Sequence, residues 1–430
     1  MNTWINFRSE FTRSVMVIAS GTVIAQAIGL ILAPILTRLY TPEVMGEFSV
    51  YYRVVTFIAT VATARYELSI PLPKSDHHSF QIFRMSLRIA LVTTFITFIG
   101  VLIYFFVNQF ALASVFIGLS VIAGTFFLVF FNLGTNWAIR KKSFRHISFS
   151  KIANSGVMNI LRVGFGFFAP NIFSLLLSFI LSLAIGSVFF LKDFLSNAKL
   201  SVNRASSKKM RVLAKTYIDF PRINLPHALT DSARDVIVAM LVVEYFSTEV
   251  FGSFDHSLRM LRLPLMLIGA AIGQVFYNKA TELKNLNKPM LPFVQKTFFI
   301  LTGLSILPFM AIFFWGEPVF AFVFGNNWSQ SGRISEVMAP WLMLNFITSP
   351  FTFLPLVFNE QKRFFFIGLG SSLLQIICFS VLPFWMGTDD HSLIQIFWIL
   401  SITQIFTLIY TARFIRSIVR KWDQSIVSMG

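Results

Sequence analysis

The sequence is poor in charge and in cysteine. Charged residues make up 13% of its 430 positions, and Cys378 is the only cysteine. A single cysteine excludes an intramolecular disulfide, and so little charge is unusual for a soluble domain. The sequence also has no Cys or His spacing typical of a metal site and no nucleophile motif. We therefore expect no metal, no cofactor and no catalytic residues.

Apolar residues dominate what is present. They make up 55% of the sequence, Phe alone occurs 52 times, and the mean hydropathy is +0.71. Apolar runs of roughly twenty residues, long enough to cross a ~30 Å hydrocarbon layer, recur along the whole length. This pattern predicts an all-α integral membrane protein with about twelve transmembrane helices. We expect them near residues 12–36, 46–70, 85–107, 111–134, 150–169, 171–192, 217–244, 250–278, 296–316, 334–358, 364–386 and 391–413.

One short pattern appears twice. Residues 40–48 read YTPEVMGEF and residues 246–254 read FSTEVFGSF, so that Gly46 pairs with Gly252, Phe48 with Phe254 and, further on, Arg53 with Arg259. Internal repeats in an apolar chain are typical of transporters built from two related bundles. We expect an N-terminal six-helix bundle at 1–192, a basic cytoplasmic linker at 193–216 and a C-terminal six-helix bundle at 217–430.

Basic residues predict the orientation. Most of the 36 Lys and Arg fall in alternate connections and at both ends, whereas the opposite connections hold only Arg38 and Arg333. By the positive-inside rule both termini are cytoplasmic, so both repeats enter the membrane from the same side. A pseudo-two-fold axis along the membrane normal follows. The charge of +17 is accounted for by topology and contact with anionic headgroups, so no nucleic-acid partner is indicated. The connections on the outside are short: residues 108–110, 170–171 and 387–390 are predicted to be no more than turns, and the largest connection lies near 317–333.

Six arginines lie inside the predicted helices, where a charge needs a watery cavity, a partner or a ligand. They are Arg53, Arg65, Arg162, Arg234, Arg259 and Arg262. One interpretation is structural: helical spacing lets Asp231 pair with Arg234 and Asp255 with Arg259, while Arg53 and Arg65 reach the interfaces. The other is functional, because the arginines outnumber the acidic groups at that depth. A surplus of guanidinium groups suits a phosphate or carboxylate, and we take Arg162, Arg234, Arg259, Arg262 and Arg53 as candidate substrate-binding residues.

Uncharged polar residues lie at comparable depth. Gln26, Asn154 and Gln274 are candidates for binding sugars, which amides recognise by hydrogen bonds. The alternative for each is a hydrogen bond between helices. Asp231 and Asp235 are the deepest carboxylates, and their burial beside Arg234 makes them candidates for ion coupling.

Several segments resemble one known family. Residues 21–26 (GTVIAQ), 34–43 (PILTRLYTPE) and 46–48 (GEF) resemble the first two helices of bacterial polysaccharide flippases of the O-antigen (Wzx) type. Residues 219–221 (DFP), 262–269 (RLPLMLIG) and 271–277 (AIGQVFY) resemble the same family. The resemblance covers the chain from end to end, and it identifies the family rather than the sugar.

The resemblance implies a member of the multidrug, oligosaccharidyl-lipid and polysaccharide exporter superfamily. Such proteins move an undecaprenyl-diphosphate-linked oligosaccharide, an O-antigen or capsule repeat unit, across the bacterial inner membrane by alternating access. The implied partners are this lipid-linked substrate, the bilayer and other polysaccharide-assembly proteins.

Three other classes of membrane protein are alternatives to a polysaccharide flippase. An ion-coupled multidrug or small-molecule exporter of the same superfamily would favour an acidic cavity. A polymerase or acyltransferase would need a large outside loop or an intramembrane His with a carboxylate. A major facilitator normally carries a Gly-Asp-Arg signature after its second helix, where this chain reads PLPKSD at 71–76.

Overall fold

A computed structural model describes residues 10–107, 112–201, 207–264 and 270–429. These residues form helices joined by short turns, with no strand among them. The predicted turn at 108–110 lies outside the described residues. Within the described part of the chain, nine helical segments are long and apolar enough to cross a membrane by length and composition. The prediction of an all-α, multi-pass membrane protein is confirmed.

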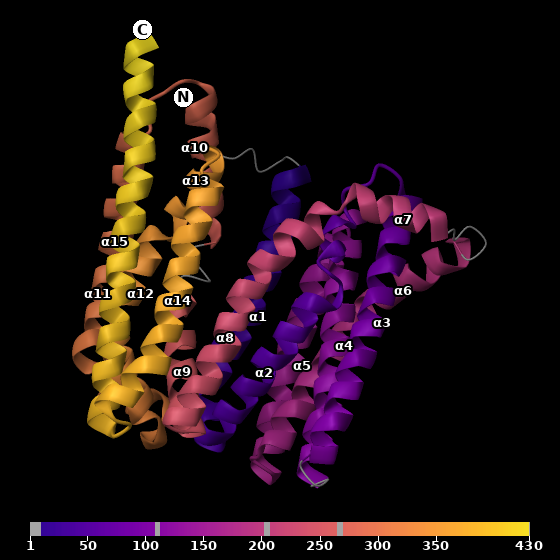
Figure 1. Ribbon diagram of the computed structural model, residues 1–430, viewed down its shortest axis with the longest axis horizontal. Coiled ribbons are helices and arrows are strands. Elements are labelled where there is room, and N and C mark those ends of the chain that lie inside the picture. The colour runs from indigo at the N-terminus through magenta and orange to yellow at the C-terminus, as the bar shows by residue number, and fades with distance from the viewer. Residues whose placement is uncertain (1–9, 108–111, 202–206, 265–269, 430) are drawn as a thin grey trace. The chain divides into compact units, whose positions relative to one another are not determined.

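The first half consists of long helices in chain order (Figure 1). Their bounds are α1 Glu10–Leu39, α2 Pro42–Ala62, α3 Asp76–Val107, α4 Leu112–Arg140, α5 Phe144–Phe168, α6 Ile172–Ser201 and α7 Ser207–Thr216. A short 3₁₀ helix, η1 (Tyr66–Ser69), lies between α2 and α3.

The second half begins with a π-helical turn at Phe220–Asn224 and continues with further helices. They are α8 Leu225–Tyr245, α9 Thr248–Pro264, α10 Ala270–Asn285, α11 Leu291–Phe324, α12 Ser329–Thr348, α13 Leu354–Val357, α14 Gln361–Met386 and α15 Asp390–Met429. The 3₁₀ helices η5 (Asn326–Trp328) and η6 (Ser349–Phe353) precede α12 and α13.

The break between α5 and α6 follows from the Pro-Asn pair at 170–171. Helix α5 ends at Phe168 and α6 begins at Ile172. The side-chain oxygen Oδ1 of Asn171 accepts the backbone N–H of Ser174 at 3.2 Å. This bond caps the first turn of α6, so the predicted turn at Pro170 and Asn171 is confirmed.

Two helix boundaries differ from the prediction. The predicted second helix runs to residue 70, whereas α2 ends at Ala62. The predicted outer loop at 317–333 is mostly helical: α11 runs to Phe324 and α12 begins at Ser329. The turn is made by Gly325, whose φ of 104° is open to glycine. Pro318 lies inside α11, which bends at Trp315 and continues to Phe324.

The chain divides into two compact units. The first contains residues 1–40 and 47–236, and the second contains 41–46 and 237–430. The boundaries between the units fall between residues 40 and 41, just before α2, between 46 and 47 inside α2, and between 236 and 237 inside α8. The ranges expected from composition, 1–192, 193–216 and 217–430, stay a prediction.

The described part of the basic linker is helical and packs on the first unit. Helix α6 continues to Ser201, and α7 lies beside α3 (Figure 1). Met210 of α7 is buried, and the Tyr66 hydroxyl of η1 donates to the carbonyl oxygen of Ala214 at 3.1 Å. Beneath them, Phe80 and Trp137 meet edge to face at 5.6 Å. The linker is thus anchored to the core at this end of α3 and α4.

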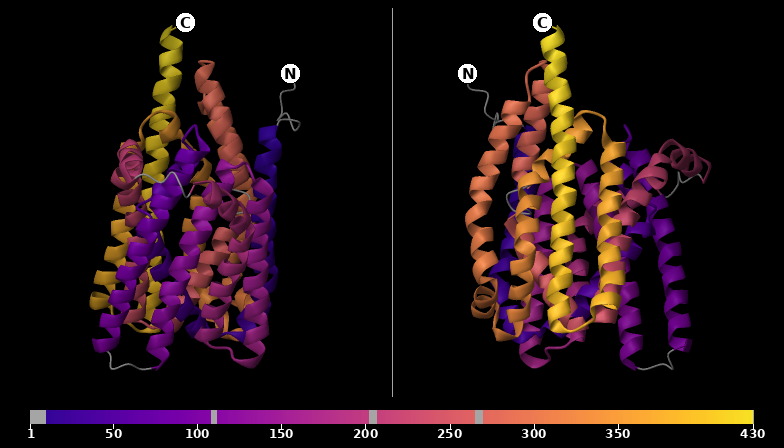
Figure 2. Two further views of the ribbon diagram at one scale, coloured as in Figure 1. Left: turned by 90° about the vertical axis from the view of Figure 1, so that its right-hand side faces the viewer. Right: turned by 60° about the vertical axis from the view of Figure 1, so that its left-hand side comes forward.

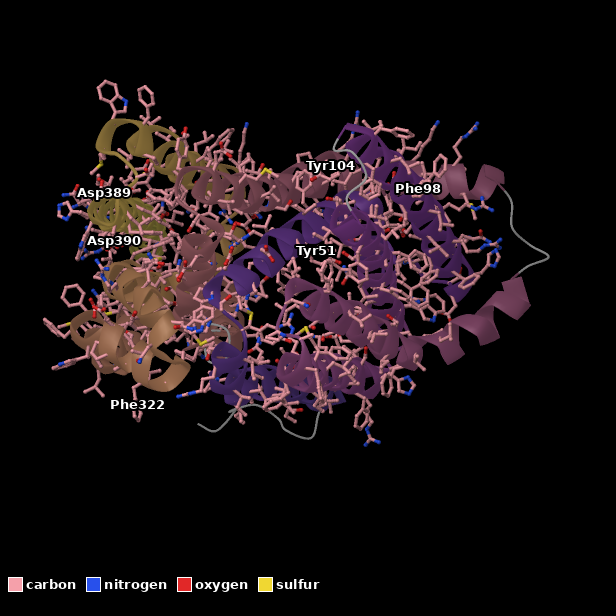
Figure 3. All side chains as sticks on the ribbon, turned by 90° about the horizontal axis from the view of Figure 1, so that it is seen from below. Tyr51, Phe98, Tyr104, Phe322, Asp389 and Asp390 are labelled. Atoms are coloured by element: carbon pink, nitrogen blue, oxygen red, sulfur yellow. The ribbon has the colours of Figure 1, made fainter. Side chains whose placement is uncertain are left out.

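In the second unit, α15 is the long helix that ends at the C-terminus (Figure 2). Its Asp423 carboxylate accepts the backbone N–H groups of Met290 and Leu291 at 2.7 and 2.9 Å. A carboxylate at a helix N-terminus satisfies unpaired donors and complements the helix dipole, so α15 caps α11. At the other end of α15, Asp390 forms an ion pair with Arg333 of α12 at 2.8 Å beside Asp389 (Figure 3).

Candidate functional site

Arg162 is the most deeply buried of the predicted intramembrane arginines. It lies on α5 with 4% of its surface exposed. Its guanidinium carbon lies 4.4 Å from the centroid of the Phe48 ring of α2, a cation–π contact. The Tyr40 hydroxyl donates to the Arg162 carbonyl oxygen at 2.8 Å, which ties the end of α1 to α5. The first unit therefore holds a buried cation against an aromatic face.

Aromatic side chains hold Phe48 in place. Its ring lies 6.1 Å from Tyr51, 6.3 Å from Tyr52 and 6.0 Å from Phe179 of α6. The Tyr51 hydroxyl donates to the carbonyl oxygen of Ser120 on α4 at 2.7 Å (Figure 3 labels Tyr51). Rings at these distances, one of them fixed by a hydrogen bond, give Arg162 a rigid support. The sequence prediction did not include Phe48 as a site residue, although Phe48 belongs to the repeated pattern.

Arg234 is paired on its own helix. It contacts Asp235 at 2.9 Å and Asp231 at 3.5 Å, and about half of each carboxylate side chain is exposed. The predicted pairing of Asp231 with Arg234 is present. One arginine faces two carboxylates, so the formal charge of this group on α8 is negative rather than positive. Arg234 is therefore a weaker anion site than Arg162.

Arg259 is also paired within its helix. Its Nη2 donates to Oδ2 of Asp255 at 2.7 Å, one turn earlier on α9, as helical spacing predicts. The Arg259 side chain is 48% exposed and that of Asp255 is 15% exposed. Arg262, in the last turn of α9, is exposed. These two arginines present guanidinium groups that an anion can reach.

The other candidate residues occupy different helices. Arg53 on α2, Gln26 on α1 and Asn154 on α5 are each partly buried. Oε1 of Gln26 is buried without a hydrogen-bond partner among the described residues. Gln274 lies on α10, and its side chain falls outside the described part of the structure. The structure places Gln26, Asn154, Arg53 and Arg162 in the first unit and Arg259 and Arg262 in the second.

The prediction that Arg65 lies inside a spanning helix is wrong. It follows the end of α2 with a left-handed φ of 61° and forms an ion pair with Glu67 at 3.5 Å. Glu67 is buried and accepts a hydrogen bond from the Thr63 hydroxyl. Burial raises the pKa of this carboxyl, an effect that Thr63 and Arg65 partly offset. The burial of Glu67 could not be predicted from the sequence, because it depends on the turn after α2.

No group of three or more His, Cys, Asp and Glu residues in the described part of the chain has a metal-binding arrangement.

A family model described as "Polysaccharide biosynthesis protein" matches residues 35–333. No curated protein sequence matches the chain.

Solved structures share the fold at low identity. The lipid II flippase MurJ in an inward closed conformation has a TM-score of 0.68 at 13% identity, covering 96% of this chain and 91% of MurJ. An inward-facing multidrug resistance transporter of the MATE family, MOP superfamily, has a TM-score of 0.62 at 14% identity, covering 94% and 99%. A MOP superfamily transporter from Pyrococcus furiosus has a TM-score of 0.57 at 11% identity, covering 96% and 97%. At these identities the likeness shows the fold alone.

Proposed function

Because the chain belongs to the polysaccharide biosynthesis protein family, we propose that it is a flippase for an undecaprenyl-diphosphate-linked oligosaccharide. It moves an O-antigen or capsule repeat unit across the bacterial inner membrane by alternating access, as a step of lipopolysaccharide or capsule assembly. The observation that carries this proposal is the family match over residues 35–333. It fits the described part of the chain, which is nearly all helical and contains nine helical segments long and apolar enough to span a membrane.

Guanidinium groups at membrane depth suit the diphosphate of this substrate. Arg162 is held against Phe48 inside the first unit, so little side-chain entropy remains to be lost on binding an anion. Arg259, Arg262 and Arg53 supply further positive charge, and Arg234 contributes less because two carboxylates face it. Forked hydrogen bonds from arginine to phosphate are stronger and more directional than those from lysine.

Amide groups suit the sugars. Gln26 offers a buried side-chain oxygen with no partner among the described residues, and an unsatisfied buried acceptor is costly until a donor binds it. A sugar hydroxyl is such a donor. Asn154 and Gln274 complete the proposed set of sugar-binding amides.

Asp231 and Asp235 are the proposed ion-coupling residues. Both carboxylates face Arg234, so protonation or sodium binding changes the charge of one compact group on α8. Transport into vesicles with and without a proton or sodium gradient tests the coupling. Activity that depends on no gradient and is unchanged in Asp231→Asn and Asp235→Asn would remove these residues from the mechanism.

Deleting the gene tests the function. The deletion strain should lose surface polysaccharide and accumulate undecaprenyl-diphosphate-linked repeat units that remain accessible only from the cytoplasm, and the intact gene should restore export. Unchanged surface polysaccharide together with increased sensitivity to toxic compounds would instead identify an ion-coupled exporter of the same superfamily.

Reporter fusions test the proposed orientation. A reporter after Lys209 should read cytoplasmic, and one after Trp328 should read periplasmic, because the basic residues gather on one side. Two reporters in the same compartment would contradict the topology with both termini in the cytoplasm.

A further inference from the structure

The two copies of the repeated pattern touch each other through their glycines. Gly46 lies in the first turns of α2 and Gly252 in the first turns of α9, and both belong to the second compact unit. A Cβ added at Gly46 would overlap the Thr248 carbonyl oxygen and lie 3.0 Å from the backbone nitrogen of Gly252. A Cβ added at Gly252 would overlap the Pro42 carbonyl oxygen and lie 2.9 Å from the backbone nitrogen of Gly46.

This contact is reciprocal in terms of the repeat. The offset that pairs Gly46 with Gly252 also pairs Pro42 with Thr248. Each glycine therefore meets the carbonyl oxygen of the residue four positions before the other glycine. We call the set of Pro42, Gly46, Thr248 and Gly252 the glycine crossing. It accounts for the presence of glycine at the same place in both copies of the pattern, where any side chain would hold the backbones apart.

The chemistry of the glycine crossing suits a membrane. Between helices in lipid there is little hydrophobic driving force, and close backbone approach through small residues supplies the packing instead. The hydrogen that glycine carries in place of Cβ points at a carbonyl oxygen on each side, which is the geometry of a Cα–H···O contact.

An arginine follows each glycine by two turns. Arg53 lies seven residues after Gly46 on α2, and Arg259 lies seven residues after Gly252 on α9. Seven residues are close to two helical turns, so each arginine lies on the same face of its helix as its glycine. Both arginines are candidate anion-binding residues. The position of Arg259 in the second unit therefore depends on how the start of α2 packs against α9.

We propose that Gly46 and Gly252 are positioning residues for transport: their backbone contact fixes the start of α2 against α9, the helix that carries Arg259. The proposal rests on the proposed function and adds a reason for the repeated pattern. An alanine at either glycine separates the start of α2 from α9 and displaces Arg259. A displacement of about 1 Å at a working site is enough to lower a rate by about a hundredfold.

Matched alanine substitutions test this role. Gly46→Ala and Gly252→Ala should each lower polysaccharide export at least about tenfold per molecule of membrane protein. The double variant should be scarcely worse than either single variant, because both substitutions remove one shared contact. Gly100→Ala on α3 and Gly303→Ala on α11 are the controls, since a Cβ at either position meets nothing within 4 Å. Losses that add in the double variant, or normal export from both single variants, would overturn the proposal.

A distance measurement separates this proposal from the flippase proposal. Glu43 and Glu249 are exposed, are equivalent in the repeat and flank the glycine crossing. Spin labels at both positions, in a Cys378→Ser background, should give one narrow distance in the parent protein and a longer or broader one in Gly46→Ala and Gly252→Ala. The control variants should keep the narrow distance. This result is expected even if the purified protein moves no lipid-linked sugar, and an unchanged distance in the crossing variants would overturn the positioning role.

Discussion

The two copies of the repeated pattern differ in what lies against their equivalent phenylalanines. Phe48 in the first copy supports the guanidinium of Arg162 at 4.4 Å. Phe254 in the second copy packs against the rings of Phe379 at 5.8 Å and Phe397 at 5.0 Å. Arg162 lies 18 residues after Phe144, where α5 begins, and Phe379 lies 18 residues after Gln361, where α14 begins. The first repeat thus places a cation against its phenylalanine, where the second places aromatic rings.

What the repeats share is an anchor to the backbone. The Tyr51 hydroxyl donates to the Ser120 carbonyl oxygen on α4 at 2.7 Å, and at the equivalent place Ser257 donates to the Ser331 carbonyl oxygen on α12 at 2.6 Å. The anchor and the glycines recur because both halves must pack in the same way. The cation does not recur, so the packing of the fold does not require it. This difference is the reason for proposing Arg162 as a substrate-binding residue.

Replacing Arg162 should have the largest effect. Arg162→Phe gives α5 the residue type of the second repeat, and Arg162→Ala removes the cation outright. Hydrogen bonds to charged groups are worth about 1.5–3 kcal/mol, so export should fall by about ten- to a hundredfold in both variants. Arg162→Lys should recover only part of the activity, because lysine lacks the planar fork. Surface polysaccharide normalised to membrane protein measures the effect.

Protein abundance decides between binding and packing for Arg162. A residue that serves mainly as a structural ion pair leaves an unpaired buried charge when it is removed, which costs several kcal/mol and lowers abundance. Normal abundance with lost export supports binding. Normal export from Arg162→Phe would contradict the proposal that the first repeat binds the substrate through Arg162.

Phe48→Leu and Phe254→Leu should each have a smaller effect than the loss of Arg162. The first should lower export and the second should lower stability. Phe48→Leu removes the ring beneath Arg162, and a cation–π contact is worth about 0.5–2 kcal/mol, so export should fall by a few fold up to about thirtyfold. Phe254→Leu should instead lower the free energy of unfolding of the purified protein by about 1–3 kcal/mol, with export per molecule unchanged. Parallel losses of export in the two variants would contradict the assignment of the cation to one repeat.

Hydropathy was sufficient to predict an all-α protein with many membrane-spanning segments, because spans of about twenty apolar residues have few alternatives in a membrane. Ion pairs one turn apart, Asp255 with Arg259 and Asp231 with Arg234, were also predictable from helical spacing. The support of Arg162 by Phe48 was not, because it joins two helices far apart in sequence. The end of α2 before Arg65 was missed because the left-handed turn at Ala64 and Arg65 contains no glycine or proline.

The shared anchors should behave alike. Tyr51→Phe and Ser257→Ala each remove a buried hydroxyl donor, and each should lower the free energy of unfolding by about 1 kcal/mol without a specific loss of export. Thermal unfolding in detergent measures both. A loss of export in Tyr51→Phe alone, at normal stability, would show that Tyr51 acts on the substrate rather than on packing.

Replacing Glu67 should have a smaller effect than the substitutions at Arg162, at the two phenylalanines and at the shared anchors. The effect should appear only in how the stability of the protein depends on pH. Because burial raises the pKa of Glu67, the folded protein binds a proton more readily than the unfolded chain does. The contribution of Glu67 to stability therefore falls as the pH rises above the ordinary carboxyl range, and Glu67→Gln removes this fall. The difference in Tm between Glu67→Gln and the parent protein should grow from pH 5 to pH 8. A constant difference would place the Glu67 carboxylate in water or in a full ion pair.

Flipping by the purified protein in vesicles tests the central claim most directly. The vesicles carry an undecaprenyl-diphosphate-linked oligosaccharide labelled in its sugar, and a glycosidase added outside digests only the outer leaflet. With the parent protein nearly all of the label should be digested. With Arg162→Phe, digestion beyond the outer half should be about ten- to a hundredfold slower, and in vesicles without protein it should stop at the outer half. Protection of the inner half in the presence of the parent protein, or equal transfer by Arg162→Phe, would contradict the account.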